Sequence, residues 1–395
     1  MGSEASTDWR LAARERLRTL VCEDAALAAS LAEIWNPDDF TARLAAAAGR
    51  DGAAIDAREI GDLLRLKSPP PAPIAPPPGW LPARVAGEGR DACVEWVRFG
   101  ARRLLEPFYE ESLAAVIYSP FNRLFGFSTR LAELAPPADA LEPTGLVFHM
   151  SRCGSTLVAQ LLAALAETLV VSEAPPIDAV VRLDASAADV DAVGHAELLR
   201  AMVGAFGRPR AGETRFLLKL DSWHTRALPL FRRAFPRTPW IFLIREPVEV
   251  LVSHLRRPGM QAAGLLPAGD IGAGWRGEAS REANTAAALA AICEGAEQAF
   301  GAGGGLVVNY AELPAGLWTR ILPHFGVRPS AADLAAMAAA AGRDAKQPAS
   351  AFTPDAGAKQ AAATEEVRTA VAGRLESVYS RLEALRRTQS PVPTA

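Results

Sequence analysis

The sequence predicts an α/β fold: a parallel sheet with helices on both faces, preceded by a small helical N-terminal domain. Three observations support this. In the second half of the chain, short apolar runs alternate with longer helical patterns, which is typical of a parallel sheet buried on both faces. A proline-rich segment separates this half from an amphipathic first region. The 395 residues are enough for two or three domains.

The domain order follows from changes in composition. Residues 1–67 have apolar side chains at helical spacing and are predicted to form a helical accessory domain. Residues 68–79 carry seven prolines, which favour extended polyproline II, so we expect a semi-rigid linker. Residues 80–140 are predicted to be a helical lead-in, and residues 141–388 the main α/β domain.

The main domain is expected to hold five strands with helices between them. The predicted strands are 145–149, 169–172, 215–220, 239–244 and 305–308, and the predicted helices are 155–167, 190–206, 223–235, 248–256 and 283–300. Ligands of such sheets bind beyond the carboxyl ends of the strands. The Gly-rich stretch 258–280 has weak periodicity and is expected to be a mobile substrate loop.

The segment Gly145–Val158 is the most informative part of the chain. It has the pattern of a buried strand, a tight polar turn and a helix start. Such a P-loop-like turn aims backbone N–H groups, and here Arg152, at one point that suits a phosphate or sulfonate. No lysine stands where an ATP-binding Walker motif places one, so Arg152 would supply the charge.

Charge and cysteine usage narrow the function classes. The formal charge is only -3, but residues 208–257 hold eleven Lys/Arg against four Asp/Glu. Such an excess marks a polyanion or nucleotide site, or more simply a solvated arginine-rich face. The four cysteines form no C-x-x-C pair, which suggests neither a metal site nor disulfides. With no signal-peptide pattern and no apolar run long enough for a bilayer, we expect a cytoplasmic protein that binds no membrane and no nucleic acid.

Two motifs resemble those of the sulfotransferases that use 3′-phosphoadenosine 5′-phosphosulfate (PAPS), and the resemblance covers about residues 141–385. Met150–Leu157 resembles the 5′-phosphosulfate loop, in the arginine-containing form of tyrosylprotein sulfotransferases and many bacterial relatives. Pro239–Ser253 resembles the second motif, a strand ending in arginine and a helix with a serine eight residues later. Glu246 departs from the Asp or Asn usual there. Val307–Leu313 resembles a Tyr-Glu-Asp-Leu segment of the family.

The resemblance implies roles for individual residues. Arg245 and Ser253 would bind the 3′-phosphate of PAPS, and Tyr310 would lie at the same nucleotide site. Arg152 would neutralise charge on the bridging oxygen, and Lys219 would reach the transferring sulfonate. The 5′ end would be held by Ser151, Arg152, Cys153, Gly154, Ser155 and Thr156.

Two residues remain candidates for the general base. Glu173 follows the second predicted strand and resembles the catalytic glutamate of the tyrosylprotein branch. Histidine is a side chain that can act as a base near neutral pH, and His224 is similar to the histidine base of the small-molecule branch, although there it lies closer to the lysine. Glu173 is the favoured candidate. His149, inside the first strand of the main domain, is interpreted as a core histidine.

The implied function is sulfonyl transfer from PAPS to a hydroxyl of a small molecule or peptide, with no metal. The N-terminal region resembles a Nif-type leader domain, which adds a ribosomally made peptide to the candidate acceptors. Two alternatives stay open. An ATP-dependent P-loop kinase would use Asp221 as a Walker-B carboxylate, and a peptide- or polyanion-binding module could keep the fold without catalysis. The oligomeric state is not predicted.

Overall fold

The computed structural model describes residues 2–52, 55–65, 71, 75–183, 191–259, 280–347, 349–351 and 353–389. The chain divides into two compact units: Met1–Arg102 with Glu110–Ala135, and Arg103–Tyr109 with Pro136–Ala395. This division differs from the predicted boundary at residues 68–79, because the segment that follows the prolines groups with the N-terminal helices. Most of the expected substrate loop, residues 260–279, lies outside the described residues.

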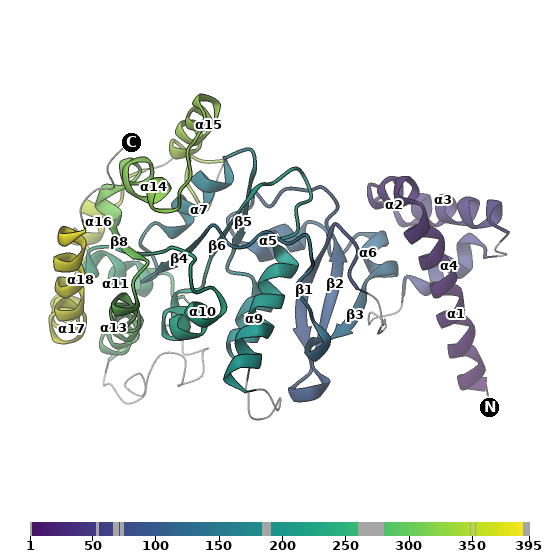
Figure 1. Cartoon of the computed structure of the whole chain (residues 1–395), viewed down its shortest axis with the longest axis horizontal. Coiled ribbons are helices and arrows are strands. Elements are labelled where there is room, and N and C mark those ends of the chain that lie inside the picture. Colours follow the sequence, from purple (N-terminus) through teal and green to yellow (C-terminus); the bar gives the residue numbers. More distant parts are fainter. Residues whose placement is uncertain are drawn as a thin grey trace. The chain divides into compact units, whose positions relative to one another are not determined.

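The first unit begins with the helices expected for residues 1–67 (Figure 1). Side chains at their N-termini explain where they start. Asp24 accepts a hydrogen bond from the backbone N–H of Leu27, and Asp56 and Glu59 form a capping box. The helices are α1 (Gly2–Glu23), α2 (Ala25–Ala32), α3 (Pro37–Arg50) and α4 (Ala57–Leu63).

The predicted helical lead-in, residues 80–140, is wrong over much of its length. Strands β1 (Trp80–Ala86), β2 (Cys93–Arg98) and β3 (Phe127–Arg130) form an antiparallel sheet there, in the order β1-β2-β3. Its described part holds two short α-helices, α5 (Tyr109–Ala114) and α6 (Pro120–Phe125), and two single 3-10 turns. On one side strand β2 pairs with β3, more than thirty positions away, and such long-range pairing leaves little trace in local periodicity.

Buried contacts explain why the helices and the antiparallel sheet form one unit. The Nε of Arg14 on α1 donates a 2.6 Å hydrogen bond to the carbonyl of Leu124, near the end of α6. A cation is favourable at a helix C-terminus. The rings of Phe40 and Phe125 meet edge to face at 6.4 Å. These contacts join α1 and α3 to α6.

The second unit confirms the predicted α/β class. Its five-stranded parallel sheet has the order β5-β6-β4-β7-β8. Each strand lies within one residue of its predicted bounds, because strands buried on both faces appear in sequence as continuous apolar runs. The strands are β4 (Gly145–His149), β5 (Thr168–Ser172), β6 (Arg215–Lys219), β7 (Trp240–Ile244) and β8 (Gly305–Asn309).

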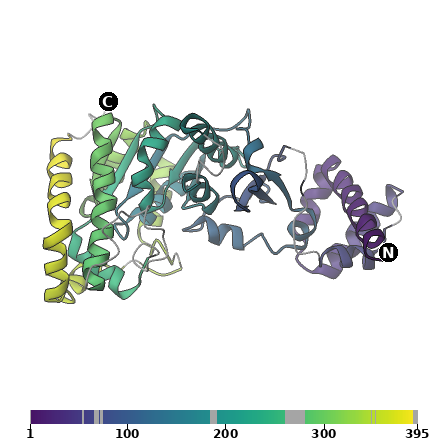
Figure 2. The same ribbon diagram turned by 90° about the horizontal axis from the view of Figure 1, so that it is seen from below.

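Helices cover both faces of this sheet. Helix α7 (Ser155–Ala163) lies on one face, and α9 (Ala192–Phe206), α10 (Leu228–Ala234) and α13 (Arg281–Ala299) lie on the other (Figure 1). Figure 2 shows α18 (Glu376–Thr388) running beside α13. An ion pair between Arg381 of α18 and Glu297 of α13 joins the two helices. The other α-helices in the described residues of this unit are α8 (Pro175–Val181), α11 (Pro247–Arg256), α14 (Leu322–His324), α15 (Ala331–Ala341), α16 (Ala356–Ala361) and α17 (Glu365–Ala370).

The strand order marks where a ligand is expected. Strand β4 lies between β6 and β7. The chain leaves β4 through α7 toward β5 on one side, and it later crosses to β7 on the other. The carboxyl end of β4 is therefore a topological switch point, where sheets of this kind bind ligands. No helix in the described part of the chain is long and apolar enough to span a membrane.

Candidate active site

The turn after β4 has an unusual backbone. Ser151 and Arg152 adopt positive φ angles of 77° and 52°, and Gly154 has φ 87°. Left-handed conformations are costly for residues other than glycine and cluster at functional sites. Helix α7 starts at Ser155, and its N-cap residue, Gly154, has no side chain that could accept from the first turn. A helix start without such a cap suits an anion, which can accept from its N–H groups.

Gly154 is required by a close contact as well as by its backbone angle. A Cβ atom at this position would lie 2.6 Å from a ring carbon of Tyr310, a separation that side chains do not adopt. The centroid of the Tyr310 ring also lies 4.0 Å from the Arg245 guanidinium carbon. Tyr310 therefore contacts both predicted anion-binding motifs.

Two buried histidines hold the first residue of the turn. The backbone N–H of Ser151 donates to Nδ1 of His149 at 3.0 Å, and Nε2 of His254 lies 3.1 Å from the Ser151 Oγ. Burial lowers the pKa of His149. Burial, with the charges of Arg152 and Lys346, lowers the pKa of His254 to about 3. Both rings are therefore neutral at pH 7.

The interpretation of His149 as a core histidine gave only part of its role, since it is buried but also bonded to the turn. His254 was missed entirely. Its one sequence signal is that it directly follows Ser253.

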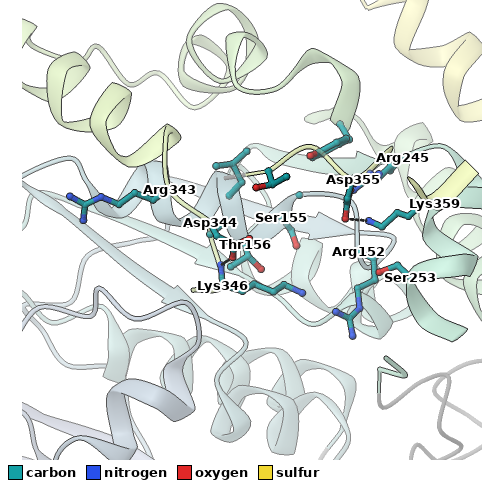
Figure 3. Close-up of a pocket in the computed structure, with 15 residues that line it drawn as sticks. Arg152, Ser155, Thr156, Arg245, Ser253, Arg343, Asp344, Lys346, Asp355 and Lys359 are labelled. Carbon is teal, nitrogen blue, oxygen red and sulfur yellow. Dashed lines mark hydrogen bonds and ion pairs between the residues drawn. The ribbon is translucent and has the colours of Figure 1, made fainter. Parts of the chain in front are cut away.

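A pocket of about 240 Å³ lies at the start of α7 (Figure 3). Both predicted motifs line it, although they are separated by about ninety residues of sequence. The predicted residues among its lining are Arg152, Gly154, Ser155, Thr156, Arg245, Ser253 and Tyr310.

Ser151 and Cys153 are not among the lining residues of this pocket. The Sγ of Cys153 points into the core, 3.2 Å from the carbonyl oxygen of Leu243. Burial raises the pKa of this thiol to about 12, so it stays protonated and unreactive. Only the backbone of Cys153 could therefore contact a ligand.

The Arg245 end of the pocket is a network of ion pairs. Arg245 donates from Nε to Glu249 at 2.7 Å, and its Nη2 lies 3.0 Å from Asp355 Oδ1. The other Asp355 oxygen accepts from Lys359 Nζ at 2.7 Å. Burial would lower the pKa of Arg245, but hydrogen bonds to Glu249 and Asp355 raise it. This end of the pocket holds two cations, each paired with a carboxylate.

At the other end, Arg152 contacts the protein itself. Its Nη2 donates to the backbone carbonyl of Arg257 at 2.7 Å. Burial, together with the nearby Arg257 charge, lowers the pKa of Arg152. The guanidinium remains ionised, because the unperturbed pKa of arginine lies so far above neutrality.

Lys219 and Glu173 meet where β5 and β6 end. Lys219 is the last residue of β6, and its ammonium donates to Oε1 of Glu173, which follows β5 at a φ of 50°. His149 Nε2 lies 3.3 Å from the same oxygen. Burial would raise the pKa of Glu173, but the Lys219 charge and then His149 hold this pKa well below its usual value. Glu173 is therefore a carboxylate at pH 7, already paired with a cation.

His224 lies in a different environment. Its side chain is buried, and Nε2 lies 2.9 Å from Oδ1 of Asp178, which also accepts from Trp223 Nε1 at 2.7 Å. The His224 Nδ1 atom has no hydrogen-bond partner among the described residues. Asp178, Asp221 and His224 are close enough together to surround a metal ion. His224 is not among the lining residues of the pocket.

Sequence reasoning assigned no role to the basic residues that approach the pocket from α16 and from the segment before it. Arg343, Lys346 and Lys359 all line it. In Figure 3, Lys346 points toward Arg152, whereas Arg343 points away. Burial, and then the charges of Arg152 and Lys219, lower the pKa of Lys346 to about 8. A cluster of basic residues in a polar stretch was the only signal for these positions.

Comparisons with known proteins give limited similarity. No family model matches the chain, and no curated protein matches it. The structure is similar to sulfotransferase STF9 from Mycobacterium avium, with 14% identity, a TM-score of 0.40, and coverage of 60% of this chain and 78% of that one. It is also similar to the sulfotransferase domain from the curacin biosynthetic pathway, with 14% identity, a TM-score of 0.37, and coverage of 59% of this chain and 98% of that one.

Proposed function

We propose that this protein is a sulfotransferase that moves a sulfonyl group from PAPS to a hydroxyl of a small molecule or peptide. The observation that carries the proposal is that one pocket is lined by both motifs, the turn after β4 and the Arg245–Ser253 segment. A ligand filling this pocket would meet open helix N–H groups at one end and buried cations at the other. Such an arrangement suits a nucleotide with anionic groups at two separate positions.

Each end of the pocket has groups that fit one end of the donor. The N–H groups at the start of α7 would bind the 5′-phosphosulfate, with Arg152 and Lys346 adding charge. Arg245, Lys359 and Ser253 would bind the 3′-phosphate.

The proposed transfer is a single in-line displacement. The bond between sulfur and the bridging phosphate oxygen breaks, and a new bond forms between sulfur and the acceptor oxygen. The acceptor proton passes to a carboxylate or imidazole of the enzyme, and 3′-phosphoadenosine 5′-phosphate leaves. Positive groups near the reacting atoms, Arg152 and Lys219, would stabilise charge that develops on the bridging oxygen.

Glu173 is our proposed general base, with His224 as the alternative. Glu173 is partly exposed, whereas the His224 side chain is 1% exposed and bonded to Asp178. The Lys219–Glu173 ion pair lowers the basicity of the carboxylate. Proton transfer to Glu173 would therefore depend on Lys219 turning toward the leaving oxygen as charge develops there.

Calorimetry with 3′-phosphoadenosine 5′-phosphate tests the proposal directly. We expect the wild type to bind it, Arg245→Ala to lose at least tenfold in affinity, and Arg387→Ala, which changes an exposed side chain of α18 outside the pocket lining, to stay close to the wild type. No binding by the wild type would reject the proposal.

A second candidate function is an ATP-dependent kinase, because Asp178, Asp221 and His224 could hold a metal ion. Turnover of ATP that stops with a chelator would favour it, whereas sulfonyl transfer unaffected by chelator would favour the first proposal.

For the first proposal, we propose a cytoplasmic enzyme that acts on a hydroxyl-bearing acceptor. The acceptors to be tested should include ribosomally made peptides. Nucleotide binding without turnover of any acceptor would point to a binding module.

A further inference from the structure

Asp355 occupies the Arg245 end of the pocket. Its two carboxylate oxygens contact two different cations, Arg245 Nη2 at 3.0 Å and Lys359 Nζ at 2.7 Å. Figure 3 shows the Asp355 carboxylate facing Lys359 beside Arg245. A carboxylate bridging two cations in this way has the geometry and charge expected of a bound ligand anion.

The exposures of the three side chains differ. The Arg245 and Lys359 side chains are 6% and 8% exposed, whereas Asp355 is 50% exposed. The cations are therefore fixed parts of the pocket wall, and the carboxylate is the member that solvent can reach. Glu249, which is 12% exposed, holds Arg245 independently of Asp355, because its Oε2 contacts both Nε and Nη2 of the guanidinium. If the network opens, Asp355 is the group that can leave with the smallest rearrangement.

The local backbone offers Asp355 a second position. It precedes the first residue of α16, where aspartate is a preferred cap, yet its side chain makes no capping hydrogen bond. The carboxylate instead reaches Lys359, four residues later on the same helix. Released from the cations, it could turn toward the open N–H groups of α16.

We propose that Asp355 is an internal counter-ion that closes the second anion position while the pocket is empty, and that a phosphate of the ligand displaces it. This inference rests on the proposed function for the identity of the ligand. A phosphate dianion replaces a single carboxylate charge between the same two cations, so the exchange is favourable for a ligand with a phosphate at this position. A nucleotide without that phosphate leaves Asp355 in place. Displacing Asp355 therefore lowers the affinity for bisphosphate nucleotides and leaves the affinity for monophosphates nearly unchanged.

The experiment compares Asp355→Asn with a control that removes one charge elsewhere. Glu365→Gln serves as the control, because Glu365 is exposed in the first turn of α17, outside the pocket lining. Calorimetry would measure 3′-phosphoadenosine 5′-phosphate, adenosine 5′-phosphate and inorganic sulfate on each protein. Thermal unfolding would confirm that each variant is folded.

We expect Asp355→Asn to bind the bisphosphate at least tenfold more tightly than the wild type and Glu365→Gln do. Its affinity for adenosine 5′-phosphate should change by less than threefold. An unchanged or weaker affinity for the bisphosphate would overturn the proposal and leave the proposed function standing. If neither the wild type nor a variant binds the bisphosphate, the sulfate titrations test the counter-ion on their own. Tighter sulfate binding by Asp355→Asn than by the other two proteins supports the counter-ion, and equal sulfate binding by all three overturns it.

Discussion

Nε2 of His254 lies 3.1 Å from Oγ of Ser151, so a buried ring on α11 contacts the first left-handed residue of the turn after β4. His149 holds the backbone N–H of the same serine from the strand side. The unusual conformation of the turn is thus maintained by two neutral imidazoles. His254 acts through Ser151 and is a positioning residue in the proposed reaction.

Removing the His254 ring should loosen the turn. We expect His254→Ala to weaken binding of 3′-phosphoadenosine 5′-phosphate by about tenfold, the size of one hydrogen bond plus a poorly held loop. His254→Gln, which can still reach the serine hydroxyl, should recover most of this loss. His324→Ala is the control. His324 bonds to the backbone carbonyls of Trp240 and Gly304 and not to the turn, so its removal should leave the affinity close to that of the wild type. Equal losses in the Ala and Gln variants would contradict the positioning role.

Arg152 separates catalysis from binding. If it stabilises charge on the bridging oxygen, Arg152→Ala should lower kcat by roughly 10²–10³-fold. The affinity for 3′-phosphoadenosine 5′-phosphate, which lacks the transferring sulfonate, should fall less than tenfold. Steady-state kinetics and calorimetry on the same preparation give both values. A kcat unchanged by the substitution would exclude Arg152 from the transfer step.

The Lys219–Glu173 pair predicts a pH dependence of stability. Glu173 has a folded pKa below its unfolded value, so its contribution to stability is complete above about pH 4.5 and is lost as the pH falls. In Lys219→Met the carboxylate loses its cation, and its folded pKa rises. The variant should be less stable than the wild type at pH 7, and its melting temperature should fall less between pH 5 and pH 3.

The control for this experiment is Lys219→Met combined with Glu173→Gln. Without the carboxylate, no unpaired buried charge remains, so the double variant should regain stability at pH 7. Parallel melting profiles for wild type and Lys219→Met between pH 3 and pH 7 would count against the predicted coupling.

Glu173→Gln alone should lower kcat by about 10²-fold or more if Glu173 is the base, which steady-state kinetics would measure.

Lys346 predicts a pH dependence of binding. Its pKa is lowered to about 8 by burial and by the charges of Arg152 and Lys219, so the empty protein loses this cation as the pH rises through 8. An anion binds the ammonium form better. Affinity for 3′-phosphoadenosine 5′-phosphate should therefore decrease from pH 7 to pH 9, and ligand binding should take up protons at pH 8.

Lys346→Met should bind more weakly at pH 7 and show a flatter profile up to pH 9. Calorimetry in two buffers of different ionisation enthalpy measures the proton uptake. A wild-type affinity that stays constant over this range would show that Lys346 does not contact the anion.

Much of the second unit was predictable from sequence because its signals are local. A buried parallel strand is a continuous apolar run, so β4 to β8 were placed to within a residue. The residues that end those strands, such as Lys219, or follow them, such as Arg245, could be assigned to one edge of the sheet from topology alone.

The antiparallel sheet of the first unit could not be found in this way. In β2, Val94, Trp96 and Val97 are buried, a spacing compatible with a helix as well as a strand. Its assignment as a strand depends on pairing with β1 and β3. For the same reason the roles of His254 and Asp355 were invisible, since each depends on a partner about one hundred residues away.

The position of Tyr310 has a further consequence. Its ring packs against Gly154, and its centroid lies 4.0 Å from the Arg245 guanidinium carbon, so the two predicted anion positions share one wall. A shift at either position that displaces this ring would also change the other position. Thermodynamic linkage then requires that occupancy of each changes the affinity of the other by the same factor. The two ends of a nucleotide would be sensed as one cooperative event.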